Sequence, residues 1–171
     1  MNISKQRDIP VAVDPKKNNF FAYKGVTLFK PNLREISEQL PFTITPTLER
    51  LQVAASYIYE QLGNPETLIT LSDKGLFYKN HATSFIVPTI PRSISDVCGA
   101  GDSVISMAAL GVAAKIDRKL VAVLCNLAGG QVCETVGVSP IDKTNLIKDV
   151  EQYNSQKWTN IVSINRANER N

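Results

Sequence analysis

The feature that most constrains this chain is the run GAGD at residues 99–102, which directly precedes an apolar segment with helical character through about residue 114. The start of a helix leaves backbone N–H groups without partners and carries partial positive charge. Glycines let such a backbone approach a ligand closely and adopt turns that other residues avoid. The run therefore predicts an anion site, suited to a phosphate or to a phosphoryl group in transfer.

Asp102, in the same turn, has two interpretations that the residues alone leave open. The carboxylate could cap the helix and complement its dipole, or it could take a proton from a hydroxyl group that attacks phosphorus. Two familiar phosphate motifs are excluded. The chain has no GxxxxGK[ST] run, and Val104 stands where GxGxxG would require its third glycine.

A second polar segment, KPNLREI at residues 30–36, follows a predicted strand. Asn32 and Glu35 are three residues apart, so both can face one side of the first turn of a helix. They could hold a hydrated Mg²⁺ beside phosphates, because Mg²⁺ prefers oxygen ligands and keeps several waters, or they could form a solvated N-terminal turn that favours the helix dipole. The run TLSDKG at 70–75 could lie against a nucleotide or simply join two strands.

Strand patterns alternate with helix patterns along the chain. Short apolar runs predict strands within residues 9–17 and 25–29, and further strands within 67–80 and 82–88 that form a hairpin, with a turn at 73–75. Helical spacing predicts helices within 32–40, 45–62, 99–114, 118–137 and from about 140 or 142 onward. This order predicts an α/β fold with a mostly parallel sheet flanked by helices. Trp158, Tyr57 and Tyr59 are expected to pack rather than to bind a ligand.

Composition narrows the class of protein. The 171 residues, of which 43% are hydrophobic, predict one domain over 1–171. The net charge is only +3 and the basic residues are scattered, which argues against a nucleic-acid partner. No apolar run approaches the roughly 18 residues that span a bilayer, so no membrane partner is expected. Three cysteines without CxxC spacing predict neither disulfides nor a zinc site and favour the cytoplasm.

Taken in order, the segments resemble the ribokinase-like (PfkB) family of carbohydrate kinases. DVCGAGDS resembles the family signature D-T-x-G-A-G-D, KPNLRE resembles N-x-x-E, and LITLSDKGLFY resembles the T-L-G-x-x-G strand and turn. The resemblance covers Ile9 to about Val150 and implies part of a three-layer sandwich. Within the family, residues 9–36 and 96–114 are most similar to members that phosphorylate D-glycero-D-manno-heptose 7-phosphate. ATP, Mg²⁺ and possible K⁺ are the implied cofactors, and a sugar phosphate is the implied substrate.

The resemblance also implies roles for individual residues. Asp102 corresponds to the catalytic base, and the amides of Gly99, Ala100 and Gly101 correspond to an anion hole. The residues that correspond to ATP contacts are Asn32, Leu33, Arg34, Glu35, Thr70, Ser72, Gly75 and Asn126. Glu35 would also hold Mg²⁺ through water, and Asp96 with the loop at 136–137 would form a monovalent cation site.

Three departures from the family pattern qualify these expectations. Cys98 replaces the usual threonine or serine, and Ser72 stands where the turn usually has glycine. The family's N-terminal half, with its lid and most sugar contacts, has no counterpart here. We therefore expect these residues alone to be weakly active or inactive, and to be completed by another segment or by a second copy. A kinase for another sugar or nucleoside, and a non-catalytic nucleotide-binding or interaction module, remain the alternatives.

Overall fold

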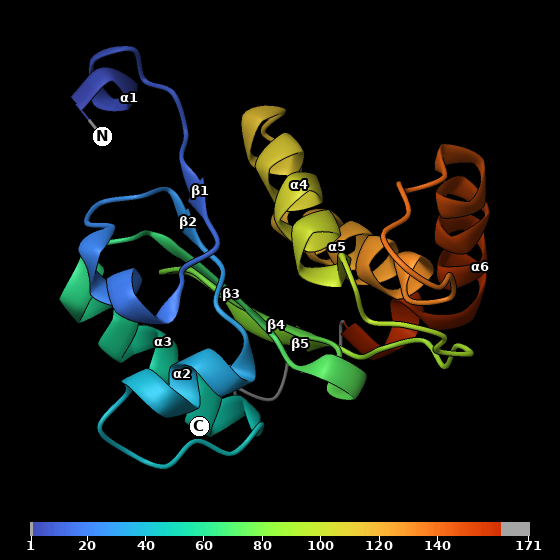
Figure 1. The fold of residues 1–171 in the computed structure, drawn as a ribbon, viewed down its shortest axis with the longest axis horizontal. Helices are drawn as coiled ribbons and strands as arrows, with labels where there is room; N and C mark the ends of the chain where they lie inside the picture. The colour runs from blue at the N-terminus through green and yellow to red at the C-terminus, as the bar shows by residue number, and fades with distance from the viewer. Residues whose placement is uncertain (1, 162–171) are drawn as a thin grey trace.

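A five-stranded sheet lies at the centre of the protein. The computed structural model describes the backbone of residues 2–161 and the side chains of residues 3–154 (Figure 1). The strands, in sheet order, are β1 (Ala12–Val13), β2 (Leu28–Phe29), β3 (Glu66–Thr70), β4 (Leu76–Lys79) and β5 (Ser84–Val87). The pairings β1–β2 and β2–β3 are parallel, whereas β3–β4 and β4–β5 are antiparallel. The sheet is therefore mixed, because the short links on either side of β4 permit only hairpin pairing.

Helices cover both faces of this sheet (Figure 1). They are α1 (Asn2–Gln6), α2 (Leu33–Gln39), α3 (Leu48–Leu62), α4 (Ala100–Ala113), α5 (Arg118–Val132) and α6 (Lys143–Ile161), with 3₁₀ turns η1 (Lys17–Ala22) and η2 (Ser72–Lys74). The sequence did not predict α1 or η1, and α5 ends about five residues earlier than expected. The described helices include none that is long and apolar enough to cross a membrane. Trp158 lies outside the described side chains.

The core forms on both sides of the sheet because side chains alternate along each strand. Leu28, Leu68 and Tyr78 point to the side of α4, α5 and α6. Their neighbours Phe29 and Phe77 point to the opposite side, which α2, α3 and η1 cover. The result is the predicted three-layer arrangement of helices, sheet and helices.

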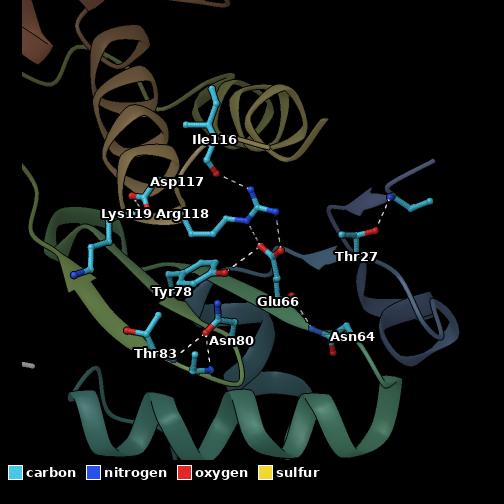
Figure 2. Close-up of polar contacts among 12 residues, drawn as sticks. Thr27, Asn64, Glu66, Tyr78, Asn80, Thr83, Ile116, Asp117, Arg118 and Lys119 are labelled. Atoms are coloured by element: carbon cyan, nitrogen blue, oxygen red, sulfur yellow. Dashed lines mark hydrogen bonds and ion pairs between the residues drawn. The ribbon is translucent and has the colours of Figure 1, made fainter. Parts of the chain in front are cut away.

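A polar cluster of Arg118, Glu66 and Tyr78, called the clasp below, joins the α4–α6 layer to the start of β3 (Figure 2). The Arg118 guanidinium, at the start of α5, donates two hydrogen bonds to the Glu66 carboxylate, with N–O distances of 2.7 and 2.9 Å. Tyr78 donates a third to Glu66 at 3.1 Å, and Arg118 also donates to the carbonyl of Ile116. A bidentate, partly buried pair of this kind fixes orientation as well as distance. The clasp lies at the amino end of β3, which leaves the carboxyl ends of the strands for the site.

Candidate functional site

The first turn of α4 is left open. Gly99 occupies the N-cap position with φ +80° and makes no side-chain capping bond. Its carbonyl accepts from the Ser103 amide at 2.9 Å, and the Ala100 amide makes only a long bond of 3.4 Å to the Val97 carbonyl. No acceptor among the described residues bonds the amides of Gly99 or Gly101. The geometry therefore offers N–H groups to a ligand at the place that the sequence predicted.

Asp102 lies in this open turn, and its side chain is exposed. Asp102 does not cap α4, because the N-cap residue is Gly99 and no side-chain capping bond forms there. None of the described residues makes a hydrogen bond or ion pair with its carboxylate. The carboxylate is thus accessible to a hydroxyl group near the same amides.

Asp96 holds the segment that leads into α4. Its two carboxylate oxygens accept from the amides of Gly137, at 3.0 Å, and Cys98, at 3.1 Å. The Gly137 amide, and then the Cys98 amide, lower the pKa of Asp96 because they stabilise its charged form. The structure therefore brings Asp96 and the loop at 136–137 together, as the resemblance implied. The carboxylate is engaged in shaping the loop, and the cation site there stays a prediction.

Arg92 fixes the same segment from its other end, which the sequence did not predict. Its guanidinium is largely buried and donates to Glu134 at 2.8 Å and to Asp149 at 2.6 Å. Glu134 follows α5 and Asp149 lies on α6, so one arginine ties the approach to α4 to two other elements. No local sequence signal could have identified partners this far apart along the chain.

The first turn of α2, in contrast, is closed by its own side chains. The Asn32 side chain accepts from the Glu35 amide, and the Glu35 carboxylate accepts from the Asn32 amide, both at 2.8 Å. This reciprocal pair is a capping box. Leu33 packs into the α2–α3 layer, and Arg34 is exposed and pairs with Glu38. Both residues support the helix in this structure.

The capping box limits how the Glu35 carboxylate could contact a magnesium ion. One carboxylate oxygen of Glu35 is occupied, and the described residues give the other no protein partner. No group of three or more histidine, cysteine, aspartate or glutamate side chains gathers anywhere in the described part of the chain. A single carboxylate suits Mg²⁺ that keeps its waters and is held mainly by phosphates. The donor set therefore fits an indirect contact through water and does not form a protein cage.

The turn after β3 lies beside α2. Thr70 forms a parallel bridge with Asn32, and its amide donates to the Pro31 carbonyl at 3.1 Å. Ser72 has φ +58°, a conformation in which glycine is usual. Gly75 has φ +94°, and a Cβ there would lie 2.0 Å from the Val87 carbonyl oxygen. Gly75 is therefore required by packing between the two hairpin strands.

Asn126 lies on α5, in the other helical layer. It is half-buried, and its side-chain amide donates to the Pro88 carbonyl at 2.8 Å. This bond fixes the segment that follows β5. Its position near an adenine stays a prediction.

Lys30, which no sequence motif singled out, extends its side chain to the start of α4. A methyl group added at Gly101 would lie 3.9 Å from the Lys30 ammonium nitrogen. Lys30 follows β2 and stands two residues before Asn32, so this contact places the start of α4 toward the carboxyl end of β2. Parallel strands place ligand sites at this end of the sheet.

Comparison with known proteins finds matches over most of this chain. The family profile described as pfkB family carbohydrate kinase matches residues 1–145. Bifunctional protein HldE of Syntrophotalea carbinolica is 34% identical over 146 residues, which are 84% of this chain and 29% of that protein. Bifunctional protein HldE of Koribacter versatilis is 36% identical over 142 residues, 83% of this chain and 29% of that protein.

Solved structures match the fold. Phosphofructokinase-2 from Escherichia coli in complex with potassium has a TM-score of 0.78 at 19% identity, covering 91% of this chain and 50% of that one. Arabidopsis thaliana ribokinase complexed with ribose and ATP has a TM-score of 0.74 at 20% identity, covering 86% and 49%. The chain thus spans about a third of the length of the curated relatives and about half of the length of the solved kinases.

Proposed function

Because the chain belongs to the pfkB family of carbohydrate kinases, we propose that it provides the ATP-binding and phosphoryl-transfer part of a sugar kinase. The observation that carries the proposal is the open first turn of α4. Unbonded amides at Gly99 and Gly101 and the exposed carboxylate of Asp102 lie within four consecutive residues. Few other arrangements place anion binding and a base within reach of one phosphorus atom.

Each group then has a defined role in the transfer. The Asp102 carboxylate accepts the proton of the sugar hydroxyl as that oxygen attacks the γ-phosphorus. A new P–O bond forms while the bond from the γ-phosphorus to the bridging oxygen breaks, and ADP departs with the electron pair. The amides of Gly99, Ala100 and Gly101 donate to the oxygens of the transferred group, with Ala100 released from its long bond to Val97. The amides of Gly99 and Gly101 are unbonded before the reaction, so these two donors need no reorganisation.

The nucleotide would lie across the starts of α2 and η2. We assign ATP contacts to the α2 turn, including Leu33 and Arg34, to the turn of Thr70, Ser72 and Gly75, and to Asn126. When bound, Mg²⁺ neutralises charge on the phosphates, and the second carboxylate oxygen of Glu35 would hold one of its waters. Asn32 and the capping box keep that carboxylate in place.

For the acceptor, we propose heptose 7-phosphate, which would yield the 1,7-bisphosphate and belong to ADP-heptose formation. The support is the similarity of residues 9–36 and 96–114 to heptose kinases. Another sugar or a nucleoside would use the same base and anion hole, so the assay must compare acceptors.

A further segment or a second copy is expected to complete the acceptor side. β1 has a sheet neighbour on one side only, and Ile9 and Leu110 are exposed at 51% and 67%. An uncovered strand edge with exposed apolar residues favours association. We therefore expect slow turnover from these residues by themselves.

The test measures MgATP binding by calorimetry and ADP release with heptose 7-phosphate, fructose 6-phosphate and ribose. Asp102→Asn should lower turnover by about 10²–10⁴-fold and leave MgATP affinity unchanged, because it removes only the base. Ser103→Ala, the neighbouring residue, is the matched control. Measurable ADP release that Asp102→Asn leaves unchanged would exclude the base, and the absence of MgATP binding would overturn the proposal.

A further inference from the structure

Lys30 carries a buried charge beside the open turn of α4. The residue follows β2 directly, and its side chain is only 3% exposed. Its ammonium nitrogen is the one atom outside the local turn that a methyl group at Gly101 would meet within 4 Å, among the described residues. The positive charge therefore lies against the backbone whose amides are unbonded.

Asp14, which follows β1, supplies the counter-charge. Its Oδ1 lies 3.1 Å from the Lys30 ammonium nitrogen, and its Oδ2 lies 3.6 Å from that of Lys16, whose side chain is 76% exposed. A buried ammonium group needs such a partner, because burying an unpaired charge is very unfavourable. Lys16 shares this carboxylate, but of the two ammonium groups only that of Lys30 is buried.

Stability alone explains the buried pair poorly. Apolar residues of similar size in place of a buried ion pair often leave a protein equally stable. A cation held away from water near a place where negative charge gathers has a stronger effect than the same cation in solvent. A methyl group at Gly101 would contact this ammonium group at 3.9 Å, which places the cation beside the turn.

We propose that Lys30 is a positioning residue whose charge, acting through the α4 turn, strengthens phosphate binding at the amides of Gly99 and Gly101, with Asp14 as its counter-charge. This inference rests on the proposed function. The amides provide direction through hydrogen bonds, and the ammonium group provides the charge that a neutral turn lacks.

The experiment compares Lys30→Met with Lys16→Met. Lys16 shares the same carboxylate but is exposed, so it is a matched control. The probes are orthophosphate, followed by the NMR shifts of the Gly99 and Gly101 amides, and MgATP and adenosine, followed by calorimetry. Lys30→Met should weaken orthophosphate and MgATP binding by about tenfold or more and leave adenosine binding unchanged. Lys16→Met should change each affinity by less than about twofold, because solvent screens its charge.

A further variant decides the case if Lys30→Met fails to fold. The double variant Asp14→Asn with Lys30→Met leaves no unpaired buried charge and should bind orthophosphate as weakly as Lys30→Met.

The outcomes separate this inference from the function on which it rests. Folded variants that bind orthophosphate as tightly as the native chain would overturn the role of Lys30 and leave the anion hole intact. If the native chain bound neither orthophosphate nor MgATP, the proposed function and this inference would both be overturned.

Discussion

The starts of α2 and α4 both follow the carboxyl ends of the strands but treat their backbone amides in opposite ways. In α2, Asn32 and Glu35 bond each other's amides at 2.8 Å. In α4, Gly99 provides no side chain, and the described residues leave its own amide and that of Gly101 unbonded. The first turn of α2 is therefore complete without a ligand, whereas the first turn of α4 is not.

The contrast shows that the unpaired amides at a helix start can either be capped by side chains or be left open to bind an anion. Every helix start has amides without intrahelical partners. Closing them with side chains stabilises the helix, whereas leaving them open to solvent gives up that stabilisation and provides an anion site. A helix start without a cap, next to a positive charge and an accessible carboxylate, is therefore more informative about function than a capped one.

The largest expected effect comes from forcing a side chain onto the open turn. Gly99→Ala should lower the free energy of unfolding by about 1–2 kcal/mol, because φ +80° is unfavourable for any residue with a Cβ. The same strain should turn the amides away and weaken orthophosphate binding by more than about tenfold. Urea unfolding and calorimetry measure the two effects.

Gly63→Ala provides the matched control for this variant. Gly63 caps the end of α3 with φ +67°, and a Cβ there would meet no atom within 4 Å. It should lose similar stability and retain native phosphate affinity. Equal loss of affinity in both variants would show that binding follows general stability and would break the contrast between the two turns.

A smaller effect is expected from opening the closed turn. Asn32→Ala should lower the free energy of unfolding by about 1 kcal/mol, because it removes one bond of the capping box. Thr47→Ala, at the start of α3, removes a longer bond of 3.4 Å and should have a smaller effect. Thermal and urea unfolding measure both, and a greater loss from Thr47→Ala would argue against the importance of the box.

The smallest effect concerns pH and the segment that supports the open turn. The amides of Gly137 and Cys98 hold the pKa of Asp96 below its ordinary value of 3.8. Because the folded-state pKa is lowered, the stabilisation is complete above the unfolded-state pKa and is lost as the pH falls through the folded-state value.

Urea unfolding of the native chain and of Asp96→Asn from about pH 6 to about pH 3 tests this dependence. The native chain should be more stable at the upper end, and the difference should shrink as the pH falls. A difference that stays constant across the range would show that the charge of Asp96 does not stabilise the segment.

Much of the local structure could be predicted from the sequence. Gly63 ends α3, Asp142 accepts from the Asn145 amide just before α6, and the helix at GAGD begins at Ala100. These signals are local, because caps and glycine stops act within one turn. The spacing N-x-x-E is compatible with a capping box as well as with a metal contact, so the sequence also allowed a capping role for Glu35.

Other features lay beyond local patterns. The parallel pairing of β1 with β2 and of β2 with β3 joins segments that are far apart along the chain, and a strand pattern does not specify its partner. The need for glycine at position 75 comes from the Val87 carbonyl, 12 residues away in the sequence. Arg92 finds Glu134 and Asp149 only because three elements converge.

By itself, the sequence determined where helices begin, which backbone turn carries glycines, and which carboxylate stands beside them, because these properties depend on neighbours along the chain. Only the tertiary structure decided that Lys30 pairs with Asp14, which follows the neighbouring parallel strand, and that Lys30 lies beside that turn. The physical reason is that a buried charge is tolerated only where folding brings its partner within reach, and that distance is set by packing of the whole sheet.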